Sequence, residues 1–224
     1  MFDGKRIGAV LLLGGEGLRF GNSTPKQFHM LGEKRVFQHA LDTLVEVGLF
    51  DEIVAVCHKD WMHLVAGRAV PGGKTRQASV YCGLKGFERD VDVVLVHDGV
   101  RPFVSERIVR DNVVGAIEWG AVDTCVPSAD TIVQVSEGQI AAIPKREGFW
   151  RGQTPQTFRT DWIVEAHERA IRDGVVNASD DCQLVLRMGR GVRIVMGDER
   201  NIKITSECDL AIAQHLYFSA TLKK

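Results

Sequence analysis

The sequence predicts an α/β fold in which a mostly parallel sheet carries helices on both faces. Apolar runs of strand length alternate with longer amphipathic segments along the chain, as in parallel sheets whose strands are joined by crossover helices. The first run ends in a glycine-rich loop and the third in a carboxylate, and ligands of such sheets bind at the carboxyl ends of the strands. The chain of 224 residues is expected to form a single domain, residues 1–224.

Five strands are expected from the apolar runs, at residues 7–13, 53–57, 93–97, 121–126 and 192–196. Several of the six expected helices follow a Ser, Thr or Asp that can cap the first free N–H groups. In the helix after Ser105, the residues Val109, Val113 and Ala116 form one apolar stripe, as expected for a helix packed on a sheet. The helices are expected to start near Val36, Thr75, Ser105, Asp161, Asp180 and Ser206.

A β-hairpin interrupts this alternation. Two short β segments, residues 131–135 and 139–143, are joined by Ser136-Glu137-Gly138, which is a hairpin signal. Neither segment has enough apolar residues to form a core of its own. We therefore expect a projecting arm at about residues 127–150 that packs on a second subunit.

Composition excludes several classes of partner. The net charge of −1 argues against broad attraction to nucleic acid or to a membrane surface. Five cysteines without a Cys-x-x-Cys pair fit reduced thiols in a cytosol, and the histidines match no zinc pattern. Because no apolar run could span a bilayer and no signal-peptide segment precedes the first strand, a cytoplasmic protein is expected.

The loop after the first strand indicates a nucleotide. It reads Gly14-Gly15-Glu16-Gly17-Leu18-Arg19 and is followed by Pro25-Lys26-Gln27. Glycines let backbone N–H groups approach phosphate oxygens, and Arg19 with Lys26 would suit a phosphorus centre that gains negative charge.

Two better-known loops are excluded, and a bland alternative is disfavoured. A Walker A loop would need Gly-Lys-Ser/Thr at the start of a helix, whereas Lys26 follows a proline. A dinucleotide fingerprint would need a third glycine where Phe20 stands. An ordinary strand-to-helix turn would explain the glycines alone, but Arg19 and Lys26 favour the ligand loop.

Four further segments carry polar residues. Gly72-Gly73 and Ser79 flank the start of a helix, where free N–H groups could hold a base or phosphate; the alternative is a capped helix start. Asp98 follows a buried strand and is placed for a metal ion or substrate hydroxyls, with Arg101 for a phosphate; the alternative is an Asp–Arg ion pair. The basic loop at residues 143–150 is either a solvated surface or a binding loop. The segment Thr154-Pro155-Gln156 suggests a rigid turn that presents a hydroxyl. Lys203 lies on an expected alternating strand, where its side chain points either to water or into a cleft.

Together these motifs resemble the IspD-type cytidylyltransferases, which make 4-diphosphocytidyl-2-C-methyl-D-erythritol, over nearly the whole chain. The resemblance implies a Rossmann-like nucleotidyltransferase fold, a Mg²⁺-dependent reaction of CTP with a small polyol phosphate, and a homodimer that exchanges its arms. The motifs that carry the resemblance are Gly14–Arg19, Pro25–Gln27, Gly72-Gly73 with Arg76 and Ser79-Val80, His97-Asp98 with Arg101-Pro102, Asp130-Thr131, Arg146–Gly148 with Trp150, Thr154–Gln156, Asp180-Asp181 and Asn201–Thr205.

The resemblance also assigns roles to individual residues. The transition-state stabilisers correspond to Arg19 and Lys26, and the pair that positions the acceptor corresponds to Arg146 and Lys203. Asp98 is the expected metal-contacting residue, although the CTP phosphates would hold most of the Mg²⁺. The expected CTP contacts are Leu13, Gly14, Gly15, Gly17, Gly73 and Ser79, and the expected acceptor contacts are Asp98, Arg101, Thr131, Arg146, Thr154 and Lys203.

Two departures from the family pattern bear on the acceptor. The first loop has Leu13-Gly14 where the family usually has Ala-Ala, and Gly99-Val100 stands where it usually has Ala-Ala. Both variants resemble relatives that act on ribitol 5-phosphate, which is the alternative acceptor. Residues 146–150 and the helix after Asp180 resemble the methylerythritol enzymes instead, and they favour 2-C-methyl-D-erythritol 4-phosphate as the acceptor. A nucleotide sensor without catalysis is a further alternative, but it would not need the Lys and Arg residues that act on the transition state.

Overall fold

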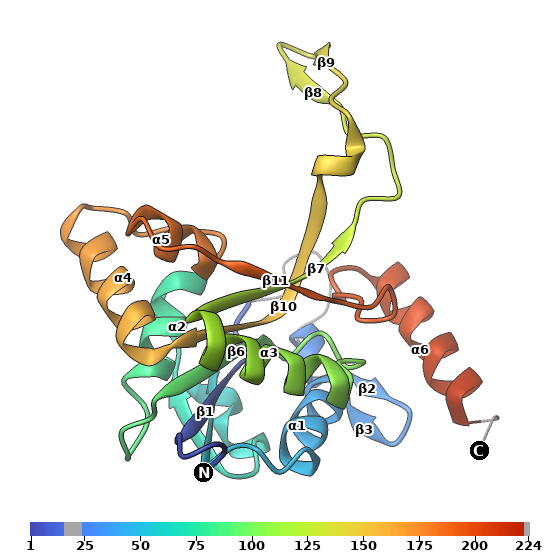
Figure 1. Cartoon of the computed structure of the whole chain (residues 1–224). Helices are drawn as coiled ribbons and strands as arrows, with labels where there is room; N and C mark the ends of the chain where they lie inside the picture. The colour runs from blue at the N-terminus through green and yellow to red at the C-terminus, as the bar shows by residue number, and fades with distance from the viewer. Residues whose placement is uncertain (16–23, 222–224) are drawn as a thin grey trace.

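The computed structural model describes residues 1–15 and 24–221 (Figure 1). In this part of the chain, a seven-stranded sheet has the order β11-β7-β10-β6-β1-β4-β5. The pairs β1–β4, β1–β6, β4–β5 and β7–β11 are parallel, and β10 runs antiparallel to both of its neighbours. The mostly parallel sheet is therefore confirmed. The strands are β1 (Ile7–Leu12), β4 (Glu52–Cys57), β5 (Arg68–Pro71), β6 (Val93–Asp98), β7 (Ala121–Pro127), β10 (Trp150–Arg159) and β11 (Arg193–Met196).

Helices cover both faces of the sheet, as predicted. On β1, the side chains of Ile7 and Leu11 join a core with α1 and α3, whereas Val10 joins a second core with α2, α4 and α5. Because both faces are covered, every residue of β1 is buried, which explains its uninterrupted apolar run. The helices are α1 (Val36–Glu46), α2 (Arg76–Leu84), α3 (Glu106–Trp119), α4 (Thr160–Arg172), α5 (Asp181–Arg187) and α6 (Glu207–Thr221).

Local capping explains where several helices begin. The side chains of Thr75, Ser105 and Asp180 each accept a hydrogen bond from a backbone N–H in the first turn of α2, α3 and α5, respectively. These bonds satisfy donors that a helix start leaves without intrahelical partners. Short elements connect the main ones: η1 (Lys26–Phe28), β2 (Met30–Leu31), β3 (Lys34–Arg35) and η2 (Lys59–Leu64). Among the described residues, no helix has the length and apolar character needed to cross a membrane.

Two sequence predictions were wrong at β10 and after β11. Thr154-Pro155-Gln156, predicted as a turn, lies inside β10, at an irregularity where the register with β7 shifts between Gly152 and Gln156. Residues 201–205, predicted as an alternating strand, form an irregular segment in which Ile204 is buried. In both places, polar side chains form hydrogen bonds inside the protein. The alternation of apolar and polar residues therefore does not predict the secondary structure there.

The predicted hairpin is present and projects away from the sheet (Figure 1). It consists of β8 (Gln134–Ser136) and β9 (Gln139–Ala142), so its first strand begins later than predicted, and η3 (Arg146–Gly148) follows. Glu137 and Gly138 both have positive φ, 50° and 78°, as a two-residue hairpin turn of type I′ requires. The arm exposes apolar side chains, namely Val133, Val135, Ile140 and Ile143.

Candidate active site

The glycine loop after β1 lies beside the start of α2. A methyl group on Gly14 would lie 3.8 Å from Oγ of Ser79, and one on Gly72 would lie 3.0 Å from the same oxygen. Gly73 is packed more closely still, because a methyl group there would lie 2.5 Å from Cβ of Ala78. Loops that follow β1 and β5 therefore meet at the first turn of α2, where a helix has free N–H groups.

Gln27 connects this loop to η1. Its side chain is buried, and its Nε2 donates to the backbone oxygen of Leu13 at 2.6 Å and to that of Gly15 at 3.4 Å. The half-buried Lys26 is the preceding residue, so these bonds fix the backbone of the lysine relative to the loop. Arg19 and Gly17, the other predicted residues of this loop, lie outside the described residues.

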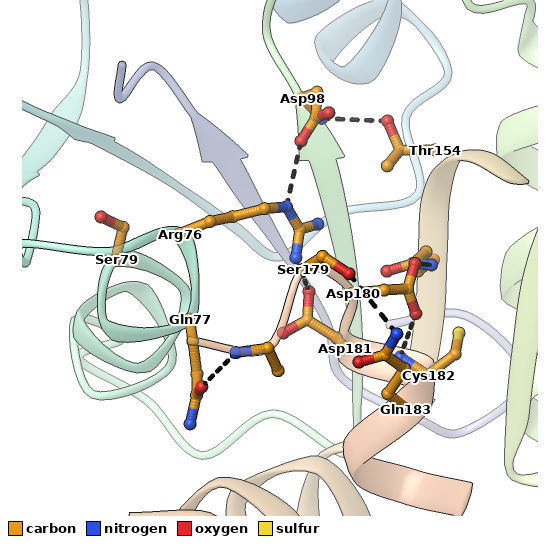
Figure 2. A network of polar contacts seen from close by, with 12 residues as sticks. Arg76, Gln77, Ser79, Asp98, Thr154, Ser179, Asp180, Asp181, Cys182 and Gln183 are labelled. Atoms are coloured by element: carbon orange, nitrogen blue, oxygen red, sulfur yellow. Dashed lines mark hydrogen bonds and ion pairs between the residues drawn. The ribbon is translucent and has the colours of Figure 1, made fainter. Parts of the chain in front are cut away.

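Asp98, at the end of β6, lies between two cations. Its Oδ2 is 2.7 Å from Nζ of Lys203. Its Oδ1 is 3.7 Å from Nε of Arg76, as Figure 2 shows. Burial alone would raise the pKa of Asp98, but the charges of Lys203 and Arg76 outweigh it and hold the pKa well below its ordinary value. Asp98 is therefore ionised at neutral pH. Lys203 is partly exposed to water, and its ammonium group contacts Asp98.

Arg101 is buried and holds the segment that carries Lys203. Its Nη1 donates to the backbone oxygen of Asn201 at 2.7 Å. The Asp98–Arg101 ion pair considered from the sequence does not form in the described structure, because Asp98 instead contacts Lys203 and Arg76. Burial lowers the pKa of Arg101 although Asp98 acts to raise it.

Thr154 positions Asp98 from inside β10. The Thr154 hydroxyl accepts the backbone N–H of Asp98 at 3.1 Å and lies 3.1 Å from Nδ1 of His97. Burial lowers the pKa of His97 to about 4, so the ring is neutral at pH 7 and Nδ1 can accept from the hydroxyl while Nε2 donates to the oxygen of Arg101. The expectation that this hydroxyl is presented at a turn is thus wrong, because it is 4% exposed and bonded within the protein.

Two predicted acceptor residues are far from this group in the same chain. Thr131 and Arg146 are exposed on the arm, which projects away from the sheet (Figure 1). Nη1 of Arg146 donates to the backbone oxygen of Ala129 at 3.0 Å, so its contact is local to the arm.

Arg76 and Asp181 also belong to this group, although their motifs alone do not indicate a role for either residue. Arg76 is the first residue of α2, and its guanidinium lies between the carboxylates of Asp98 and Asp181 (Figure 2). A cation is unfavourable at a helix N-terminus because the helix dipole is positive there. An arginine directly after a Thr cap is therefore a signal that carboxylates stand nearby.

Leu13 and Gly99, one residue from each departure from the family pattern, are in direct contact. A methyl group on Gly99 would overlap Cδ2 of Leu13 and would lie 3.2 Å from the backbone oxygen of Leu12. Leu13 is 1% exposed, so it fills the space that the family's alanine at position 99 would take. The larger side chain at Leu13 and the missing side chain at Gly99 therefore compensate for each other in volume.

This contact predicts a specific rescue of stability. Gly99→Ala should lower the free energy of unfolding by about 1–3 kcal/mol through overpacking, and Leu13→Ala should also be destabilising because it leaves a cavity. The double variant should lose less than the sum of the two, since each change removes the defect that the other creates. Urea unfolding of the four proteins measures this, and strictly additive losses would contradict the compensating exchange.

Comparisons with known proteins identify the family to which the chain is similar. The family model described as IspD, 2-C-methyl-D-erythritol 4-phosphate cytidylyltransferase, matches residues 7–218. The 2-C-methyl-D-erythritol 4-phosphate cytidylyltransferase of Clostridioides difficile (strain 630) is 38% identical over 92% of this chain and 92% of the relative. The ribitol-5-phosphate cytidylyltransferase of Lactiplantibacillus plantarum is 35% identical over 94% of this chain and 97% of the relative. The crystal structure of 4-diphosphocytidyl-2C-methyl-D-erythritol synthase from Anaerococcus prevotii DSM 20548 is similar with a TM-score of 0.84 and 31% identity, covering 99% of this chain and 100% of that one.

Proposed function

The chain belongs to the 2-C-methyl-D-erythritol 4-phosphate cytidylyltransferase family, and we propose that it transfers the cytidylyl group of CTP to 2-C-methyl-D-erythritol 4-phosphate. The products are 4-diphosphocytidyl-2-C-methyl-D-erythritol and pyrophosphate. The match of the family model over residues 7–218 carries this proposal. Two features at the same edge of the sheet support it. The glycine loop would bind CTP, and the Asp98–Lys203 pair would bind the acceptor.

The acceptor phosphate needs no general base. The second pKa of a phosphate monoester is about 6, so at neutral pH the group is already mostly a dianion. One of its oxygens attacks the α-phosphorus of CTP, and the bond to the β-phosphate bridge oxygen breaks, so that pyrophosphate leaves. Positioning and charge stabilisation are sufficient for this in-line displacement.

Electrostatic repulsion between CTP and the acceptor is the main obstacle. Lys26 and Arg19 are the proposed cations at the transferred phosphorus, and Lys203 with Arg146 would hold the acceptor phosphate. Asp98 would accept hydrogen bonds from acceptor hydroxyls, because it is ionised and fixed by the Thr154 hydroxyl. Arg101 would support this side through the segment it holds at Asn201.

The nucleotide base is assigned to the loop residues Leu13, Gly14, Gly15 and Gly73 together with Ser79. The Ser79 hydroxyl donates to the backbone oxygen of Thr75 at 2.9 Å, which leaves its oxygen as an acceptor. An acceptor suits the exocyclic amine of cytosine and not the carbonyl that uracil has in its place.

CTP should therefore be strongly preferred over UTP. A mismatch would place two acceptors opposite each other and leave buried groups without partners. Pyrophosphate release from each nucleotide, with 2-C-methyl-D-erythritol 4-phosphate as acceptor, measures the preference. Equal use of UTP would contradict the cytidylyl assignment, and no release with any acceptor would favour a nucleotide sensor.

Mg²⁺ is proposed to arrive with the triphosphate. Within the described residues, no group of three or more His, Cys, Asp or Glu side chains could hold a metal ion. Asp98, the expected contact, does not fit as a ligand in this arrangement because Lys203 and Arg76 face its two oxygens. The CTP phosphates are thus the proposed ligands, where Mg²⁺ would neutralise their charge.

Ribitol 5-phosphate is the second candidate acceptor. The Leu13–Gly99 contact follows the pattern that resembles ribitol-phosphate relatives, and the relative from Lactiplantibacillus plantarum has that name. Both acceptors carry one phosphate and several hydroxyls, so the same charged residues would serve either.

Arm exchange in a homodimer is proposed to complete each site. The support is the projecting arm with exposed Val135, Ile140 and Ile143, together with the absence of Arg146 from the Asp98 group of its own chain. An apolar arm of this kind is stabilised by packing on a second copy.

The reduced thiols are consistent with the proposed cytoplasmic location.

A further inference from the structure

Resting on the proposed function, we propose that Asp181 and His167 are positioning residues that control acceptor binding through Arg76. Neither residue faces the proposed substrates. They form the far end of a chain of charged and polar groups that reaches Asp98. The inference therefore extends the acceptor site into the layer formed by α4 and α5.

The groups form a continuous series across four elements. Nε2 of His167, on α4, donates to Oδ1 of Asp181 at 3.0 Å. Oδ2 of Asp181, on α5, accepts from Nη1 of Arg76 at 2.6 Å. Nε of Arg76, on α2, lies 3.7 Å from Oδ1 of Asp98 (Figure 2). The other oxygen of Asp98 is 2.7 Å from Nζ of Lys203.

The His167–Asp181 end of this series is buried. Asp181 is 1% exposed and His167 is 0% exposed. Burial alone would raise the pKa of Asp181, but the hydrogen bond from His167 and the charge of Arg76 outweigh it and lower the pKa. A buried carboxylate with two such partners has one favourable geometry, and that geometry fixes the guanidinium of Arg76.

Asp181 keeps Arg76 from closing on Asp98. Charges of Asp181 and Asp98 both stabilise the arginine cation, and the contact to Asp181 is the shorter of the two. Without the negative charge of Asp181, Arg76 would move the short distance to Asp98 and pair with it directly. Asp98 would then lose its place for acceptor hydroxyls, and its contact with Lys203 would change.

The test measures both KM values in Asp181→Asn. The KM for 2-C-methyl-D-erythritol 4-phosphate should rise about tenfold or more, because small displacements of a binding group have large effects, while the KM for CTP stays within about twofold. His167→Gln, which keeps a donor near Nε2, should show a smaller rise in the same KM. The matched control is Glu165→Gln on the same helix, whose carboxylate contacts Arg190 at 2.5 Å and whose removal should leave both KM values unchanged.

A double-substitution cycle separates positioning from folding. In Arg76→Gln, adding Asp181→Asn should produce no further rise in the acceptor KM, because Asp181 acts through Arg76. Thermal unfolding of each protein corrects kcat for the folded fraction. If Asp181→Asn does not fold, the same two KM values measured in His167→Gln test the inference, which predicts a rise in the acceptor KM alone.

Three outcomes would overturn the inference. These are unchanged KM values with kcat falling only with the folded fraction, an equal rise in both KM values, or additive effects of Arg76→Gln and Asp181→Asn. In each of them the wild-type enzyme is active and the proposed function stands. A wild-type protein without turnover on either acceptor would instead overturn the proposed function, and the inference with it.

Discussion

Lys26→Ala should lower kcat by about 10²–10³-fold while CTP binding changes much less. The proposed role of Lys26 is to stabilise the negative charge that develops on the α-phosphorus, and losing one preorganised donor at such a centre has an effect of this size. Interactions that strengthen only in the transition state affect kcat rather than affinity. Steady-state kinetics with both substrates, together with CTP binding by calorimetry, measures the two effects separately.

Lys34→Ala is the matched control for this variant. Lys34 is a nearby exposed lysine that pairs with Asp42 on the surface, so its removal should leave kcat unchanged. A Lys26→Ala protein with preserved kcat and a proportionate loss of CTP affinity would make Lys26 a simple binding residue. Urea unfolding of both variants establishes that the lost activity does not come from lost folding.

Mixing two inactive homodimers should restore activity, which is the second large effect. If Arg146 acts on the partner's site, a dimer of one Lys26→Ala chain and one Arg146→Ala chain contains one site with both lesions and one with neither. A dimer in which Arg146 serves its own chain's site would have one lesion in every site. Activity after subunit exchange therefore distinguishes the two arrangements.

Two controls make the mixing experiment decisive. Mass measurement of differently tagged chains must first show that subunits have exchanged. Lys145→Ala removes the neighbouring exposed cation of the arm and should leave activity intact, so a loss shared by both arm variants would indicate a general charge effect. Exchange without recovered activity would contradict the arm-exchange proposal.

Much of the fold could be predicted because it follows from apolar pattern and capping. The run that became β1 is buried on both faces, and the caps at Thr75, Ser105 and Asp180 mark helix starts. The hairpin was predicted from its turn, where Gly138 adopts positive φ. In each case, a local physical requirement selects the residue type.

The strands that were missed lack such a local signal. β10 lies inside the sheet but contains buried Gln153, Thr154 and Gln156, whose hydrogen-bond partners come from distant segments. β5 is a short strand at the sheet edge with half-buried residues. The sequence periodicity does not reveal polar residues that are buried by long-range hydrogen bonds, so it could not predict β10. β5 is too short and too exposed to give a periodic signal.

The candidate site was predicted as a set of residue types rather than as a geometry. The sequence indicated that Asp98 and Lys203 carry chemistry, but not that they contact each other at 2.7 Å. It placed the Thr154 hydroxyl at the ligand, whereas the hydroxyl holds the backbone of Asp98. The role of Arg76 depends on Asp181, which lies 105 positions further along the chain, and only the fold brings them together.

Direct competition between the two acceptors tests the central claim. Equal concentrations of 2-C-methyl-D-erythritol 4-phosphate and ribitol 5-phosphate are incubated with the protein, Mg²⁺ and limiting CTP, and the cytidine diphosphate products are quantified by mass spectrometry. The proposed function predicts that 4-diphosphocytidyl-2-C-methyl-D-erythritol is the main product. A mixture dominated by CDP-ribitol, or one without either product, would contradict it.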